Sequence, residues 1–385
     1  MYNQIRGDIM IIQSTRIYID EQFQPAQLVI ENDTITKIQP YNTEPCDKDY
    51  QDMRIIPGLI EIHCHGFNGM DANHATYDGL KHWFRELPKE GVTGIFPSTS
   101  TCEEENILNG FKLISQIMQE EPEGTIPLGI HVEGPQISFN YKGAHNPYLI
   151  RKPDVEEIKR WQQVANNNIR LITIAPEMDK DHALIKYCKE NNIHVSIGHS
   201  GAKYDECVKA HENGAESFTH TFNGMLGVHH REPGTAGAAL SIDDMYAELI
   251  CDGVHVHFAL AKVLAKVKGK DRLLLVTDAV QIKGLKPGIY EMPGRWVQVF
   301  EDGCGRLKDG RLAGSSNKLI NMVKNLVNEC GIDEVTAINA ATQNPCNFLE
   351  IKNKGYIKEN FDADMVVIDD DYNVVQTYIL GKAKL

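Results

Sequence analysis

The pattern of apolar and polar residues divides the chain into two kinds of structure. Near both ends, short runs alternate between apolar and polar residues, which predicts strands with one buried face. These runs cover 9–19, 27–31 and 34–38 at the N-terminal end, and 355–357, 365–368 and 374–379 at the C-terminal end. Asn32 and Asp33 separate two of them and are typical of a hairpin turn. We therefore expect residues 1–56 and 351–385 to form one small β-sandwich domain.

Between these ends, over residues 57–350, apolar strand-like runs alternate with amphipathic helical segments. The helical segments cover 77–89, 103–120, 153–166, 180–191, 204–213 and 258–268. The strand-like runs end near His65, Ser98, Glu133, Ala175, His199, His220, Cys251 and Asp278. Alternation of this kind favours βαβ units with a parallel sheet, and eight strands are the number that a closed (β/α)8 barrel needs. The predicted fold class is therefore α/β, a TIM barrel with a small β-sandwich domain built from both termini.

One segment, at about 280–316, breaks this alternation. It contains several short β-like pieces and many glycines between Asp278 and the next helix, which we expect to begin near Asn317. An inserted hairpin over the mouth of the barrel would explain it and would return the backbone of Leu312, Ala313 and Gly314 to the site. A surface excursion is the alternative, since most loops of this length run over the surface.

Composition narrows the function classes. With 53 acidic and 39 basic side chains, the net charge is −14, which argues against nucleic acid or an anionic membrane as the main partner. The nine cysteines form no CxxC pair, which is typical of a reducing compartment. The segment MYNQIRGDIM lacks an apolar run long enough for a signal peptide, and no stretch approaches the roughly 18 apolar residues of a membrane helix. We expect a cytoplasmic protein.

The candidate chemistry lies at the ends of the strand-like runs. Potential metal ligands follow five of them, and they are His63 and His65, Glu133, His199, His220 and Asp278. All strand C-termini converge on one face of a barrel, so these side chains can meet around an ion. Imidazoles and carboxylates suit divalent Zn, Fe or Mn. We expect one or two such ions in each subunit.

Each of these residues also has a structural interpretation. An isolated HxH pair is weak evidence, although the strand period of two places His63 and His65 on the same face. His199 and His220 could each be hydrogen-bonded core histidines, and Asp278 could cap a helix. Their shared position at strand ends favours the metal site. Asp278 follows an apolar run, where a carboxylate is suited to proton transfer with a metal-activated water.

The motifs around these residues carry a resemblance to a known family. PGLIEIHCHG, GIHVEGP, KGAHNP, SIGHS, THTFNGM, DGVHV, VTDA, LAGS and NPC…GYIKENFDADMVVID occur in this order from Pro57 to Ile368. Together they resemble the N-acetylglucosamine-6-phosphate deacetylases of the amidohydrolase superfamily. The first motif recurs across amidohydrolases, whereas HVEGP, KGAHNP and THTFNGM are much narrower.

The resemblance assigns expected roles to residues of this chain. It implies that Glu133, His199 and His220 bind the main ion, and that His63 and His65 support a second one. Strand four, residues 169–175, has no lysine, so Glu133 is the natural bridging group. Asp278 corresponds to the catalytic acid/base and His145 to a histidine that contacts the substrate amide. The expected sugar and phosphate contacts are Ala144, Asn223, Gly224, Arg231, His255, Leu312, Ala313 and Gly314. The resemblance also implies a homodimer.

Two further observations concern substrate binding. His229, His230 and Arg231 form a compact basic cluster directly after a metal motif, and a guanidinium suits phosphate oxygens. A solvated basic turn is the alternative. Two positions depart from the family pattern. Glu61 replaces an aspartate, where we expect little effect, and Gly224 replaces an alanine, which would loosen the loop over the sugar.

The predicted reaction is removal of the acetyl group from N-acetyl-D-glucosamine 6-phosphate by metal-activated water, with Asp278 as general base and then acid. Three alternatives remain. One is deacetylation of the C4 epimer, N-acetylgalactosamine 6-phosphate. Another is a different amidohydrolase reaction, on a cyclic amide or a base, which the missing strand-four lysine disfavours. The last is a non-catalytic scaffold on the same fold.

Overall fold

The computed structural model describes residues 9–292, 295–301, 304–308, 310 and 312–385. The segment MYNQIRGDIM, in which we expect no signal peptide, therefore lies mostly outside the described residues. Among the residues that are described, no helix combines the length and the apolar character needed to cross a membrane.

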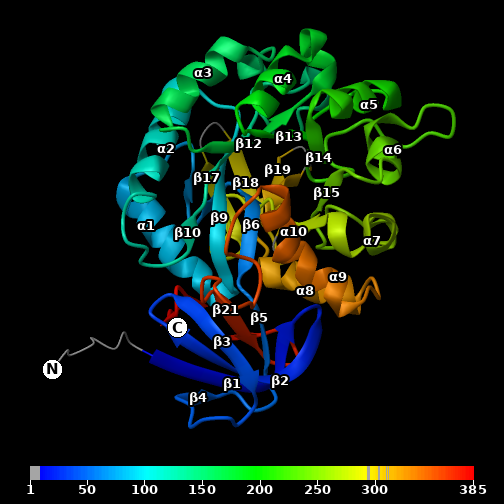
Figure 1. Ribbon diagram of the computed structural model, residues 1–385. Helices are drawn as coiled ribbons and strands as arrows, with labels where there is room; N and C mark the ends of the chain where they lie inside the picture. Colours follow the sequence, from blue (N-terminus) through cyan, green and yellow to red (C-terminus); the bar gives the residue numbers. More distant parts are fainter. Residues whose placement is uncertain (1–8, 293–294, 302–303, 309, 311) are drawn as a thin grey trace.

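Parallel strands form the centre of the molecule, as Figure 1 shows. In order around the barrel they are β6 (Leu59–Cys64), β9 (Val92–Thr99), β11 (Ile130–Glu133), β12 (Ile169–Ile174), β13 (His194–Ile197), β14 (Ala215–Phe218), β15 (Tyr246–Leu249) and β16 (Leu273–Leu275). The short strand β10 (Ile126–Pro127) also pairs with β9. The ring closes just past β16, where Ala279 forms a parallel bridge with Cys64 of β6. The predicted (β/α)8 barrel is confirmed, and its strands end within a few residues of the predicted positions.

Helices surround this barrel. They are α1 (Tyr77–Glu86), α2 (Glu104–Ile117), α3 (Val155–Val164), α4 (Ala183–Glu190), α5 (Tyr204–Asn213), α6 (Gly234–Ser241), α7 (Phe258–Arg272), α8 (Leu319–Asn328), α9 (Glu334–Ala341) and α10 (Gln343–Phe348). Short 3-10 turns cover Leu87–Glu90, Phe139–Tyr141, Pro147–Leu149, Pro176–Met178 and Lys180–His182. Helix α6 was not predicted, because its sequence GTAGAALS is buried over six of eight residues and has no polar face to give a helical period.

Strands from both chain ends form a separate mixed sheet below the barrel (Figure 1). They are β1 (Ile9–Ile19), β2 (Gln22–Glu31), β3 (Thr34–Pro40), β4 (Lys48–Asp49), β5 (Arg54–Pro57), β21 (Met365–Ile368), β22 (Val374–Ile379) and β23 (Lys382–Ala383). Asn32 has a φ of 58° in the turn between β2 and β3, as the hairpin prediction requires. The strands share one core that includes Leu28 and Met365. Residues 355–357, predicted to be strand-like, form no strand because their backbone is irregular. The domain boundaries stay a prediction.

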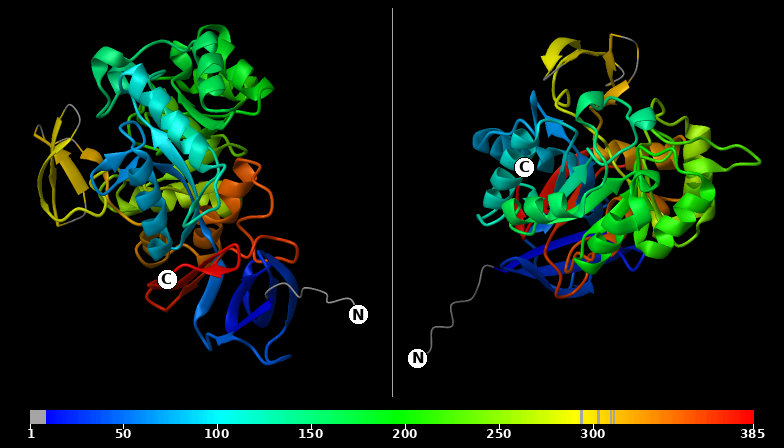
Figure 2. Two further views of the ribbon diagram at one scale, coloured as in Figure 1. Left: turned by 90° about the vertical axis from the view of Figure 1, so that its left-hand side faces the viewer. Right: turned by 90° about the horizontal axis from the view of Figure 1, so that it is seen from above.

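The insertion after β16 forms a sheet of its own. Its antiparallel strands are β17 (Gly288–Met292), β18 (Arg295–Val299), β19 (Cys304–Leu307) and β20 (Leu312–Ser315). The sheet stands out from the barrel in both views of Figure 2 and has a small apolar core around Ile282 and Val297. Its last strand returns to the barrel, because Ser315 pairs with Ala279. Beside it, β7 (Gly66–Phe67) and β8 (Met70–Asp71) form a short hairpin.

Candidate active site

The predicted ligands lie at the carboxyl ends of the barrel strands. His63 belongs to β6 and Glu133 to β11, while His65, His199, His220 and Asp278 follow β6, β13, β14 and β16 within a few residues. The carboxyl ends of parallel strands gather at one end of a barrel, where active sites of this fold are found. The structure therefore brings together residues that are far apart in the sequence.

Glu133 lies at the centre of this group. Its Oε1 atom is 2.9 Å from His220 Nε2, 3.2 Å from His199 Nε2 and 3.4 Å from His63 Nε2. Its Oε2 atom is 3.2 Å from His65 Nε2. All of these side chains are buried. One carboxylate thus faces both pairs of histidines, which is the geometry expected of a group shared between two ions.

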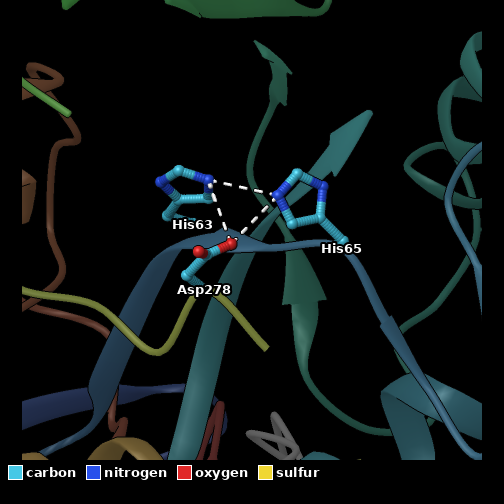
Figure 3. Close-up of side chains that lie close together, drawn as sticks. All are labelled: His63, His65 and Asp278. Atoms are coloured by element: carbon cyan, nitrogen blue, oxygen red, sulfur yellow. Dashed lines mark hydrogen bonds and ion pairs between the residues drawn. The ribbon is translucent and has the colours of Figure 1, made fainter. Parts of the chain in front are cut away.

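His63, His65 and Asp278 form the second part of the cluster, and their polar ends point toward one another in Figure 3. Asp278 Oδ1 is 3.2 Å from His65 Nε2 and 3.6 Å from His63 Nε2. The Nε2 atoms of the two histidines are 3.2 Å apart. These three side chains therefore offer three ligand atoms around one point.

The hydrogen bonds on the far side of the rings test whether this cluster fits a metal. His63 Nδ1 is 2.9 Å from the carboxylate of Glu248, and His65 Nδ1 is 2.9 Å from the carbonyl oxygen of Ser98. Both partners are acceptors, so each Nδ1 carries the proton and each neutral ring presents an Nε2 lone pair to the other. Facing lone pairs repel unless a cation lies between them. The donor set therefore fits a divalent metal such as Zn, Mn or Fe.

The charges of the cluster agree with this interpretation. Burial would lower the pKa of His65, but hydrogen bonds to Asp278 and Glu133 raise it to about 9. Burial would raise the pKa of Asp278, but when the two rings are protonated, the hydrogen bond from His65 and the charge of His63 hold it well below its usual value. The two carboxylates thus favour positive charge among the imidazoles. A divalent ion supplies that charge while leaving the rings neutral.

The backbone at three of these positions adopts an uncommon conformation. The φ angle is 46° at His199, 30° at His220 and 46° at Asp278. Positive φ is rare for residues other than glycine and costs roughly 1–3 kcal/mol. Each of the three lies two or three residues after the end of a barrel strand, where its side chain joins the cluster. This repeated strain at one end of the barrel is typical of a functional site.

His145 reaches the cluster from the loop after β11. Its Nδ1 atom is 3.3 Å from the backbone nitrogen of Thr101, which can only donate, so the proton of the neutral ring is on Nε2. Nε2 is 3.3 Å from Glu133 Oε2. Burial and the nearby His199 lower the pKa of His145 to about 4. His145 therefore presents a neutral N–H donor to the site, and Ala144 precedes it in the same loop.

The predicted sugar loop, Asn223 and Gly224, also lies against the cluster. The backbone nitrogen of Asn223 donates to the carbonyl oxygen of His220 at 3.0 Å. Gly224 has a φ of 55°, and a Cβ atom there would lie 2.7 Å from Nδ1 of His199. His199 Nδ1 donates to the carbonyl oxygen of Tyr141 at 2.8 Å. Gly224 thus packs tightly against His199, whose ring is oriented by the carbonyl oxygen of Tyr141. This close packing does not support the expected loosening of the loop.

The inserted sheet reaches the same region through β20, which contains Leu312, Ala313 and Gly314. The residue after Gly314, Ser315, donates its backbone N–H to the carbonyl oxygen of Asp278 at 3.1 Å. Gly314 has a φ of 80°, and a Cβ atom there would lie 3.1 Å from that oxygen. This strand therefore packs directly beside Asp278, where the sequence placed it.

The two residues expected to hold the phosphate, His255 and Arg231, have different surroundings. His255 is buried, and its Nδ1 is 2.6 Å from Asp252 Oδ2. Its Nε2 has no hydrogen-bond partner among the residues that the structure describes. Arg231, in contrast, is exposed, and its guanidinium contacts His230 in the same loop. The loop between β14 and α6 projects from the side of the barrel in Figure 1.

Comparisons with known proteins place the chain in a family. The profile of the "Amidohydrolase family" matches residues 54–384. The chain belongs to the amidohydrolase family. An N-acetylglucosamine-6-phosphate deacetylase of Bacillus subtilis is 36% identical over 345 residues, covering 88% of this chain and 87% of that protein. An N-acetylgalactosamine-6-phosphate deacetylase of Escherichia coli O157:H7 is 33% identical and covers 97% of this chain and 98% of its own length.

Solved structures agree with the sequence comparison. An N-acetyl-D-glucosamine-6-phosphate deacetylase mutant from Mycobacterium smegmatis, in complex with N-acetyl-D-glucosamine-6-phosphate, has a TM-score of 0.92 at 28% identity and covers 98% of this chain and 100% of that one. The corresponding enzyme from Thermotoga maritima has a TM-score of 0.88 at 31% identity, with 98% and 99% coverage. This chain is a metal-dependent amidohydrolase, which removes the scaffold alternative.

Sequence reasoning missed several groups that orient the site of this amidohydrolase. Glu248 of β15 bonds His63, Asp252 bonds His255, and the carbonyl oxygen of Tyr141 bonds His199. Glu248 had a detectable signal, because it is a charged residue within an otherwise uncharged strand, YAEL. The Tyr141 carbonyl had none, since a backbone oxygen leaves no trace in the side-chain sequence.

Glu61 and His131 also support the site. We expected Glu61 to have little effect, but it is buried, and its Oε1 accepts the backbone N–H groups of His63 and Thr277 at 3.0 and 3.4 Å. It therefore joins the first barrel strand to the segment after the last one. His131 bonds the hydroxyls of Ser98 and Thr173 at 3.0 and 2.9 Å, so both of its ring nitrogens are engaged by protein groups.

Proposed function

We propose that this amidohydrolase removes the acetyl group of N-acetyl-D-glucosamine 6-phosphate, giving D-glucosamine 6-phosphate and acetate. The observation that carries the proposal is the convergence of the Nε2 atoms of His63, His65, His199 and His220 on Glu133, with Asp278 alongside. The B. subtilis relative named for this reaction, 36% identical, supports the choice of substrate.

In the proposed site, Glu133, His199 and His220 hold one divalent ion, and His63 and His65 hold a second. A Zn, Fe or Mn ion bound there would supply Lewis acidity, which lowers the pKa of water to about 7. The donor atoms are imidazole nitrogens and carboxylate oxygens, which supports the choice of these metals.

The side chains of the site divide the remaining work. His145 directs its Nε2–H to the acetamide oxygen and so stabilises the negative charge that develops there. Asp278 accepts a proton from the attacking water and passes it to the sugar nitrogen as the C–N bond breaks. The water oxygen ends in acetate and the proton in the amine.

The sugar and phosphate contacts form a second part of the proposal. Ala144, Asn223, Gly224 and residues 312–314 surround the acetamido sugar, and His255 with Arg231 binds the phosphate. We propose a homodimer in which Arg231 or its neighbours reach the phosphate pocket of the partner subunit. The exposure of Arg231 on a projecting loop supports this arrangement. Light scattering coupled to size exclusion tests it, and a monomer at micromolar concentration would contradict it.

A cytoplasmic location completes the proposal. No disulfide bond joins the nine cysteines, all of which lie among the described residues, and a reducing compartment maintains this state.

The epimeric substrate, N-acetylgalactosamine 6-phosphate, is the second candidate, and the E. coli O157:H7 relative supports it because the match covers 97% of this chain. Acetate release from both epimers by the metal-loaded enzyme decides between them. We expect kcat/KM to favour the glucosamine epimer at least tenfold. The opposite preference would make N-acetylgalactosamine 6-phosphate the substrate. Acetate release from neither epimer would contradict the proposed reaction.

A further inference from the structure

Glu248 is a buried carboxylate in the wall of the barrel. Its side chain is 0% exposed, and it lies on β15 between Ala247 and Leu249, which are also buried. Its Oε1 has no hydrogen-bond partner among the residues that the structure describes. An ionised carboxylate in such a place is costly unless specific partners compensate for the lost hydration. The buried carboxylate of Glu248 therefore requires partners that offset the cost of its burial.

The other oxygen of Glu248 contacts both halves of the metal cluster. Oε2 is 2.9 Å from His63 Nδ1 and 3.0 Å from the backbone nitrogen of His220. The first contact fixes the proton of neutral His63 on Nδ1 and leaves the Nε2 lone pair facing His65 and Asp278. The second holds the end of the neighbouring strand, β14. One oxygen thus orients a histidine in each half.

The support of His63 differs in kind from that of the other histidines. His65 and His199 donate their Nδ1 protons to the backbone carbonyl oxygens of Ser98 and Tyr141. His220 Nδ1 has no hydrogen-bond partner within the described part of the chain. His63 alone among these histidines has a carboxylate behind its ring. A carboxylate in this position makes the imidazole a stronger metal donor, and removing such a partner typically costs 10–100-fold in metal affinity.

We propose that Glu248 is a positioning residue that controls the occupancy of the subsite formed by His63, His65 and Asp278, and therefore whether the enzyme holds a second ion. The inference rests on the proposed function only in requiring a metal at this site, not in the identity of the sugar. The competing explanation is that Glu248 merely fixes the end of β14 through His220, which would affect both ions alike.

The test compares full-length wild type with Glu248→Gln. Each protein is stripped with a chelator and dialysed against increasing free Zn²⁺, and the metal bound per chain is measured by mass spectrometry. Wild type is expected to bind two ions. Glu248→Gln retains an amide oxygen for the His220 N–H but loses the charge. We expect its first ion to bind as in wild type and its second about 10–100-fold more weakly.

A matched control removes a similar bond elsewhere in the barrel. Glu216 Oε2 is 2.9 Å from His194 Nδ1 on adjacent strands, the same distance as in the Glu248–His63 pair, but Glu216 is half-exposed and outside the cluster. Glu216→Gln is expected to bind both ions like wild type. Glu248→Asp keeps the charge, so it should retain more of the affinity for the second ion than Glu248→Gln. If Glu248→Gln does not fold, Glu248→Asp is compared with wild type in its place.

Several outcomes would overturn the inference. Equal weakening of both ions would support the structural role alone, and unchanged binding of the second ion would remove any role in metal occupancy. A wild type that binds one ion would show that the subsite takes no second metal. Two ions in an enzyme that releases no acetate would refute the proposed function while leaving the inference intact.

Discussion

The metal cluster and the predicted phosphate residues are built in different ways. The cluster is carried by the ends of barrel strands, is buried, and has most of its rings held by a second contact, such as the Ser98 carbonyl behind His65. The phosphate residues lie on loops. His255 is held by Asp252 from its own loop, and Arg231 is exposed and contacts the side chains of His229 and His230 in its own loop.

This difference indicates how the two regions contribute to catalysis. Strand ends are fixed by the hydrogen bonds of the barrel, so the cluster has its shape before substrate arrives, which is the condition for electrostatic stabilisation of a transition state. Loops are more mobile than the strands and helices that they connect, so the contacts that they make are less rigidly fixed. We therefore expect changes in the cluster to abolish turnover and changes in the loops to act mainly on KM.

The largest effect is expected from removing a proposed ligand of the main ion. His199→Ala leaves Glu133 and His220 with an incomplete ligand set, so both metal content and activity should be lost. Metal analysis and acetate release on the same preparation measure this. His194→Ala is the control. His194 lies on β13, the strand that His199 follows, and it is also buried and also bonds a glutamate, but it is outside the cluster. A His199→Ala enzyme with normal metal content would refute the ligand assignment.

Arg231→Ala is expected to have an intermediate effect. A charge-assisted hydrogen bond to phosphate contributes roughly 1.5–3 kcal/mol, so KM for the phosphorylated sugar should rise about 10–100-fold with little change in kcat. Arg160→Ala, at an exposed arginine of α3, should leave KM unchanged. If Arg231→Ala affects the unphosphorylated sugar equally, the phosphate assignment is wrong.

Asp252→Asn should have the smallest effect. Asp252 orients His255, and although burial would lower the pKa of His255, the bond to Asp252 raises it. Losing that charge weakens one contact to phosphate, and we expect KM to rise up to about tenfold. Asp244→Asn, which removes a surface carboxylate 3.0 Å from His211, is the control. A large loss of kcat instead would place His255 among the groups that take part in the reaction.

The contrast between strand ends and loops also decides how much of the fold and the site could be predicted from the sequence. The barrel strands were predictable because each is a short apolar run, and the clustering of the proposed ligands was predictable because each stands at the end of such a run. Helix α6 was not, since its small buried residues show no helical period. The role of Glu248 requires His63, which is 185 residues away, and the role of Tyr141 belongs to its backbone oxygen.

The most direct test of the account is the activity of Asp278→Asn together with its metal content. Wild type loaded with metal should release one acetate for each free amine formed from N-acetyl-D-glucosamine 6-phosphate. Asparagine cannot carry the proton, so kcat should fall by about 10²–10⁴-fold while the ion held by Glu133, His199 and His220 stays bound. A variant that keeps its metal and most of its activity would contradict the proposed role of Asp278 and the mechanism built on it.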